Sequence, residues 1–211
     1  MDACCDQKAE ELSALRGKHK RVLTIVLIIN ALLFFVEAAA GLLANSTALL
    51  ADSLDMLGDA LVYGFSLYVL WRSAEWKAVA AIVKGSVMAL FGAGVLAEAG
   101  YKMWAGVVPT AETMGIVGIL VLIGNAACFF ALYRHRSDDI NMRSTWVCSR
   151  NDILANISVL VAAAGVKTFG ASWPDIVVGA GIAALFLRSA STVLGDAAAE
   201  LHRAKSRAAA S

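Results

Sequence analysis

Long apolar stretches separated by short polar segments dominate the chain from residue 21 onward. A helix that crosses the hydrocarbon core of a bilayer needs about 20 mostly apolar residues. Stretches of that length run over 21–43, 47–71, 78–100, 114–133, 145–166 and 174–195. Hydrophobic residues make up 59% of the chain, whereas an ordinary soluble domain contains about 45–50%. The sequence therefore predicts an all-α membrane protein, a six-transmembrane-helix bundle.

The basic residues predict how this bundle is oriented. Most Lys and Arg residues lie in the N-terminal segment, in the loops after the second and fourth spans, and in the C-terminal tail. The opposite loops contain only Lys102 and Lys167. Because cytoplasmic loops carry the excess of Lys and Arg, both termini are expected to be cytoplasmic. The expected organisation is a cytoplasmic N-terminal segment (1–20), a six-helix transmembrane domain (21–196) and a short cytoplasmic tail (197–211).

The expected surrounding of the chain is the lipid bilayer, as a multi-pass protein of the cell (inner) membrane. The net charge is only +1, and the basic residues gather at the ends of the predicted spans, so no nucleic-acid partner is expected. Tryptophan is typical of the boundary between membrane and water. The tryptophans near the predicted span ends are Trp71, Trp76, Trp104, Trp146 and Trp173.

Two of the predicted spans carry acidic or thiol groups at helical spacing. Asp55 and Asp59 are four residues apart in the second span, and Cys148 and Asp152 have the same spacing in the fifth. Residues four apart share one face of a helix. A charge at the bilayer centre costs at least about 2.5–3.5 kcal/mol, so these groups need a compensating role. Two facing pairs can supply four ligands to one ion, the number in a tetrahedral site.

These four groups cannot all stay ionised together in lipid. They must be partly protonated, hold a divalent cation, or alternate between these states. Alternation would exchange metal for protons, because protons leave the ligands when metal binds. The plainer interpretation is that protonated carboxyl groups make hydrogen bonds between helices, and two matched pairs favour the metal site over it.

Other polar residues in the spans have simpler expected roles. Asp52 lies nearer the outer end of the second span, where a solvated role, a role on the entry path of the ion and a plain surface position are all open. Glu37 is expected to face the bundle interior or a water-filled cavity, and a structural pairing is favoured over metal ligation. Hydrogen bonds between helices are the expected role of three asparagines, namely Asn30, Asn125 and Asn156.

The run NALLFFVEAAAGLLANSTALLADSLDMLGDA (residues 30–60), with the Cys148/Asp152 pair, resembles the cation diffusion facilitator family of divalent-metal transporters. The resemblance implies a homodimer in which each protomer exports a divalent metal ion from the cytoplasm in exchange for protons. Carried over by position, the metal ligands would be Asp55, Asp59, Cys148 and Asp152.

Departures from the family pattern concern the ligand types and the C-terminus. The family often has His where this chain has Asp55, and His or Asp where it has Cys148, so the predicted site contains no histidine. A typical member also has a cytoplasmic metal-binding domain after the sixth helix, so a short member without that domain is expected. Without it, metal sensing and the usual dimer contacts are in question.

The mixed ligand set does not by itself name the metal. Thiolate favours softer ions and carboxylate favours harder ones. Zn²⁺ is the first choice, with Co²⁺, Fe²⁺ and Cd²⁺ open, and no cofactor is expected besides the transported ion. Cys4 and Cys5 could capture soft metal, although an inert terminus is preferred. A transporter, not an enzyme, is expected. A passive cation channel and an intramembrane aspartyl protease are the alternatives.

Overall fold

Helices account for almost the whole of the described chain. The computed structural model describes residues 20–69, 74–133 and 140–210, with side chains at 24–60, 79–133, 152–199 and 201–202. The helices are α2 (Lys20–Ala44), α3 (Thr47–Val69), α4 (Ala74–Ala105), α5 (Ala111–Tyr133), α6 (Ile140–Phe169) and α7 (Trp173–Ala210). Each predicted span overlaps one helix, and no two spans share a helix, which confirms the all-α bundle.

The lengths of the helices suit a membrane. In the described residues, α2, α4, α5, α6 and α7 are each long and apolar enough to cross one. The 23 residues of α3 span about 35 Å at about 1.5 Å per residue, which exceeds the hydrocarbon thickness of about 30 Å. Large apolar side chains cover the outside, such as Leu43 and Phe130, which are 83% and 62% exposed. Such an exterior is typical of a surface that faces lipid.

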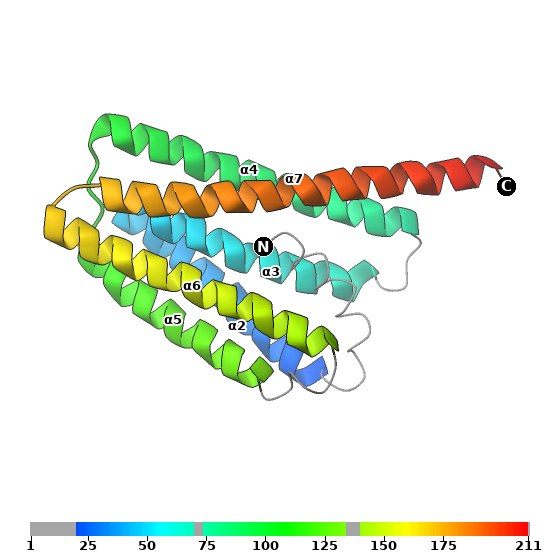
Figure 1. Cartoon of the computed structure of the whole chain (residues 1–211), viewed down its shortest axis with the longest axis horizontal. Helices are drawn as coiled ribbons and strands as arrows, with labels where there is room; N and C mark the ends of the chain where they lie inside the picture. The colour runs from blue at the N-terminus through cyan, green and yellow to red at the C-terminus, as the bar shows by residue number, and fades with distance from the viewer. Residues whose placement is uncertain (1–19, 70–73, 134–139, 211) are drawn as a thin grey trace.

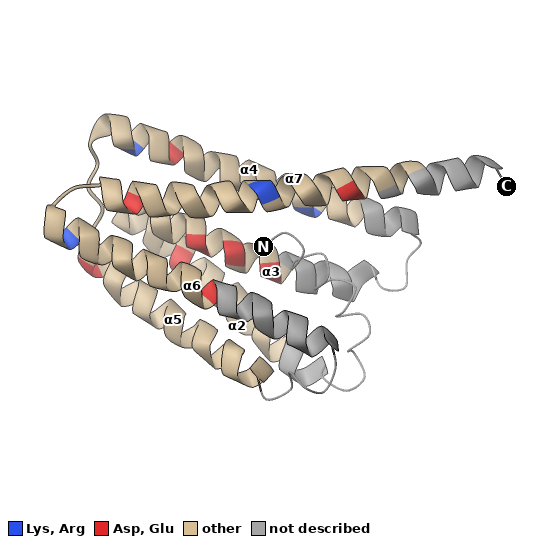
Figure 2. Ribbon diagram, in the orientation of Figure 1, with Lys and Arg blue, Asp and Glu red and all other residues tan. Residues whose placement is uncertain are grey.

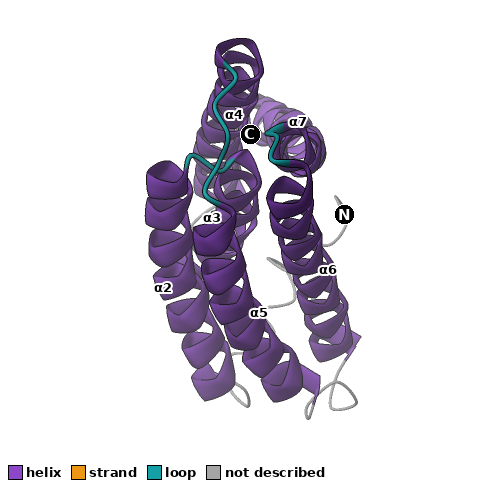
Figure 3. Ribbon diagram, turned by 90° about the vertical axis from the view of Figure 1, so that its left-hand side faces the viewer, coloured by secondary structure: helices purple, strands orange, loops and turns teal. Residues whose placement is uncertain are grey.

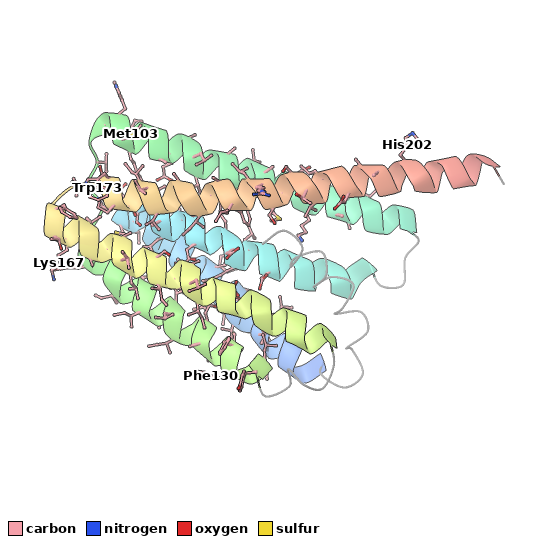
Figure 4. All side chains as sticks on the ribbon, in the orientation of Figure 1. Met103, Phe130, Lys167, Trp173 and His202 are labelled. Carbon is pink, nitrogen blue, oxygen red and sulfur yellow. The ribbon has the colours of Figure 1, made fainter. Side chains whose placement is uncertain are left out.

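The connections described by the structure all lie at one end of the bundle (Figures 1 and 3). They are the short links at 45–46, 106–110 and 170–172. Trp173 and Lys167 lie at this end (Figure 4), and Trp104 near it is 86% exposed. Lys102 was expected in a loop, but α4 continues to Ala105 and holds its side chain in an ion pair with Glu98 at 2.6 Å.

Helix α3 occupies the middle of the bundle. It contacts α2, α4, α6 and α7, while α4 packs along α7 and α5 packs along α6. The turn that precedes it is tight: Ser46 N–H donates to the Gly41 carbonyl at 2.9 Å, and Asn45 has a φ of 54°. Asparagine tolerates this left-handed conformation better than most residues. The turn reverses the chain, so α3 runs antiparallel to α2.

A carboxylate from α7 caps the buried start of α3. The Asp175 carboxylate accepts hydrogen bonds from the Ser46 hydroxyl at 2.6 Å, and from the backbone N–H groups of Thr47 at 2.7 Å and Ala48 at 3.0 Å. The first N–H groups of a helix have no partner within the helix, and the positive end of the helix dipole favours an anion. Asp175 therefore fixes the N-terminal end of α3 against α7.

Replacing Asp175 with Asn is expected to lower the free energy of unfolding by several kcal/mol, because hydrogen bonds to a charged group contribute about 1.5–3 kcal/mol each. Asn would also point an amide donor at groups that donate. The measurement is thermal unfolding of purified protein in detergent. The matched control is Asp196→Asn, which changes an exposed carboxylate on the same helix. Equal stability of the two variants would contradict the capping role.

The last helix is longer than the span predicted for it. The sequence pattern ends that span at 195, but α7 continues to Ala210 without a break and projects beyond the other helices (Figure 1). The predicted tail at 197–211 therefore begins inside a helix. The division of the chain into terminal segments and a transmembrane domain stays a prediction.

Candidate metal centre

A chain of buried polar side chains joins α5, α6 and α3 and continues to α2. Asn125 Nδ2 donates to Asn156 Oδ1 at 2.8 Å, and Asn156 Nδ2 donates to Asp52 Oδ2 at 2.6 Å. The carboxyl groups of Asp52 and Glu37 lie close enough to share a hydrogen bond when one carries a proton. None of the four side chains is more than 2% exposed. We call these four residues the polar network.

The polar network confirms two of the sequence-based expectations. Asn125 and Asn156 form a hydrogen bond between helices, as expected. Glu37 is fully buried in the bundle interior, also as expected, and its carboxyl group lies beside that of Asp52, while a structural pairing stays a prediction. Hydrogen bonds of this kind fix the rotation and register of packed membrane helices.

Two other expectations were wrong. Asp52 is only 1% exposed, so it is neither solvated nor on the surface, while a role on the entry path of the ion stays a prediction. The reason is that α3 lies in the middle of the bundle, where α2 and α6 pack against it. Asn30 donates to the Val26 carbonyl at 2.9 Å, one turn back in its own helix, and not to a neighbour. A short polar side chain can reach the carbonyl four residues earlier.

The bond between Asp52 and Asn156 sets the register of α3 against α6. The two helices run in opposite directions. Helix α3 begins at the end of the bundle that holds the described connections, and α6 ends there. Three residues beyond Asp52 along α3 is Asp55, and four residues before Asn156 along α6 is Asp152. These positions are therefore at one depth, about one helical turn from the polar network.

One further turn gives the second pair of predicted ligands. Along α3 this turn leads to Asp59, and along α6 it leads back to Cys148. The Asp55, Asp59 and Asp152 side chains are all half-buried. Figure 2 shows the acidic positions of α2, α3 and α6 near the middle of the bundle's long axis. The register thus gives each predicted ligand of α3 a counterpart at matching depth on α6.

The ligand set itself stays a prediction. The backbone at Cys148 belongs to α6, but its side chain lies outside the described residues, as do Cys4 and Cys5. Among the described side chains, no group of three or more His, Cys, Asp or Glu residues is close enough to hold a metal ion. A complete four-ligand site therefore requires Cys148 and a closer approach of α3 and α6.

A multi-pass membrane bundle with acidic groups at its centre defines a class of protein that moves or binds cations within the membrane. The family model for the cation efflux transmembrane domain matches residues 23–202. The chain belongs to this cation efflux family, and it is an integral, multi-pass membrane protein.

Several curated transport proteins are similar to the chain. The cadmium, cobalt and zinc/H⁺-K⁺ antiporter of Bacillus velezensis is 29% identical over 85% of this chain and 62% of its own length. The zinc transporter ZitB of Yersinia pestis is 27% identical over 88% of this chain and 64% of its own length. The metal cation efflux system protein CzcD of Cupriavidus metallidurans is 25% identical over 75% of this chain and 54% of its own length. The chain thus spans less than two thirds of these relatives.

Proposed function

We propose that this protein exports divalent transition-metal cations from the cytoplasm in exchange for protons. Zn²⁺ is the first choice, with Co²⁺, Cd²⁺ and Fe²⁺ as further candidates. The ion binds between α3 and α6, and the proposed ligands are Asp55, Asp59, Cys148 and Asp152. The main support for this proposal is the hydrogen bond between Asp52 and Asn156. It fixes the register of α3 against α6, and this register places the two ligand pairs at matching depths. Family membership and the names of the relatives support the class of cargo.

The exchange follows from the ligand chemistry. Three carboxylates and a thiolate carry more negative charge than a buried site tolerates, so the empty site must hold protons. A divalent ion displaces those protons when it binds, and returning protons weaken the site so that the ion leaves. The cycle requires the site to face the two sides of the membrane in turn. On the cytoplasmic side it loads metal and loses protons, and on the outer side the reverse occurs.

The assembly and location belong to the same proposal. Both termini are cytoplasmic, the chain resides in the cell membrane, and two copies form a homodimer. The family resemblance supports the homodimer, and the distribution of Lys and Arg supports the orientation. An intramembrane protease would use two catalytic Asp residues on different helices, and the second residue of each pair would then have no role. Membership of a cation efflux family favours transport over that alternative.

The test is metal flux into proteoliposomes that contain the purified full chain. Zn²⁺, Co²⁺, Cd²⁺ and Fe²⁺ are offered in turn, with and without an imposed pH gradient. We expect flux that saturates with metal concentration, changes with the direction of the gradient, and is largest for Zn²⁺. Flux that rises linearly and ignores the gradient would instead indicate a channel. No flux of any of the four ions above that of protein-free liposomes would overturn the proposal.

A further inference from the structure

The two acids of the polar network keep oxygen atoms without a hydrogen-bond donor. Both carboxyl oxygens of Glu37 and the Oδ1 of Asp52 are buried without such a partner among the described residues. The exposed fractions of these side chains are 0% and 1%. Neither acid forms an ion pair with a described Lys, Arg or His. Buried polar groups are nearly always satisfied, so three oxygens left without donors at one place indicate a missing ligand.

Electrostatics identifies that ligand as a cation. Two adjacent carboxylates cannot both stay ionised where water is excluded, because each raises the energy of the other. The Asp55 charge acts on both of them and adds to the repulsion. The neighbours contributed by α5 and α6, Asn125 and Asn156, carry no charge. One positive charge between Glu37 and Asp52 would remove the conflict.

We propose that Glu37 and Asp52 form a second cation site, separate from the four metal ligands, which holds one monovalent cation that is exchanged for the metal in addition to the protons of the ligands. This inference rests on the proposed function. The free atoms are all carboxyl oxygens, which favour a hard cation over a soft one. The occupant is thus a proton or an alkali ion, since both supply one hard positive charge.

The asparagines hold this site in shape. Asn156 donates to Asp52 Oδ2 at 2.6 Å, which leaves Asp52 Oδ1 for the cation. Asn125 in turn holds the amide of Asn156 through the bond at 2.8 Å. One carboxyl oxygen of Asp52 is therefore held by α6, and the other oxygen of Asp52 and both oxygens of Glu37 are left for the cation.

Coupling to the metal arises through charge. Asp55 is a proposed metal ligand and lies three residues, or about 4.5 Å along the helix axis, from Asp52. A divalent ion bound at Asp55 cancels the negative charge that favours a cation at Glu37 and Asp52. Metal binding therefore expels the monovalent cation, and the cation weakens metal binding to the same extent, because coupling between two sites is reciprocal.

The experiment compares wild type with Glu37→Gln and Asp52→Asn in proteoliposomes. Each change keeps the size of the side chain and removes one charge, and Asp196→Asn on the exposed face of α7 is the matched control. One arm imposes a pH gradient with no alkali ion present. The other imposes a K⁺ or Na⁺ gradient at constant pH. In each arm we measure how far Zn²⁺ accumulates inside the liposomes against its own concentration gradient. The flux of Zn²⁺ down its gradient is measured separately.

We expect both variants to keep a downhill Zn²⁺ flux, lowered by no more than the factor of about 10–100 that is typical of changes outside the metal's own ligands. We also expect them to accumulate Zn²⁺ to a lower ratio than wild type does, because they exchange one cation fewer for each metal ion. The arm in which the variants accumulate less Zn²⁺ than wild type names the cation of the second site. Variants that accumulate Zn²⁺ as wild type does would overturn the second site and leave the proposed function intact. Wild type without any metal flux would instead overturn the proposed function and this inference with it.

A second readout does not depend on flux. Purified protein in weakly buffered detergent is titrated with Zn²⁺, and released protons are followed with a dye and released K⁺ or Na⁺ with an ion-selective electrode. The second site predicts that Glu37→Gln releases one monovalent cation fewer per bound Zn²⁺ than wild type. Equal release from both proteins would overturn the second site even if the variant proved too unstable for reconstitution.

Discussion

Replacing Asp152 with Asn is expected to reduce Zn²⁺ flux to that of protein-free liposomes. The amide keeps the size of the carboxylate but loses the charge and one ligand oxygen that a metal ion needs. Changes to groups that only orient a metal ligand lower affinity or activity by about 10–100-fold, so the loss of a ligand should exceed that range. The measurement is Zn²⁺ uptake under an imposed pH gradient, together with Zn²⁺ binding to the purified variant.

The control for this prediction separates charge from location. Asp196→Asn removes an acidic charge from the exposed face of α7 and should transport as wild type does. The position of Asp152, one turn from Asn156, also allows a purely structural effect, which thermal unfolding would reveal. A folded Asp152→Asn protein that still transports Zn²⁺ at the wild-type rate would show that the site assignment is wrong.

The helices could be predicted because the bilayer imposes a simple rule on the sequence. A stretch of about 20 apolar residues has few alternatives to a spanning helix. Spacing also predicted which side chains share a face of a helix, so the pairs on α3 and α6 could be proposed before their register was known. Asn125 and Asn156 could be assigned to contacts between helices, because an amide facing lipid would stay unsatisfied.

The sequence could not predict which helix covers which face. Asp52 is buried because α3 is the central helix, and the sequence of residues 47–69 does not indicate that α3 takes the central place in the bundle. Asp175 could not be assigned either, because its partner Thr47 lies 128 residues earlier in the chain. A Lys or Arg partner was as plausible for Asp175 as a helix start. Tertiary packing supplies this information, and spacing along one helix does not contain it.

The polar network could be found only in part. Glu37 and Asp52 each lie within the run that resembles the family, and Asn156 is four residues beyond Asp152, on the same face of α6. That spacing was a usable signal for Asn156 as a neighbour of the site. No comparable signal connected Glu37 to Asp52, because their contact depends on the tight turn between α2 and α3.

Replacing Gly179 with Ala is expected to disrupt the bundle. A Cβ at this position of α7 would lie 2.6 Å from the carbonyl carbon of Thr47 and 2.8 Å from the amide nitrogen of Ala48. The obstacle is backbone, so no side chain can rotate away from it. Overpacking of a closely packed interior costs about 1–3 kcal/mol and sometimes more. Here the start of α3 must also move away from α7, which would lengthen the bonds to Asp175.

The matched control lies two residues further along the same helix. A Cβ at Gly181 would meet no atom within 4 Å, so Gly181→Ala should leave stability unchanged or raise it slightly, since Ala favours helix more than Gly does. Both variants are compared by thermal unfolding in detergent and by gel filtration. A Gly179→Ala protein as stable as Gly181→Ala would show that α3 and α7 can separate at low cost. In that case the contact between the start of α3 and α7 is not what positions the acidic residues of α3.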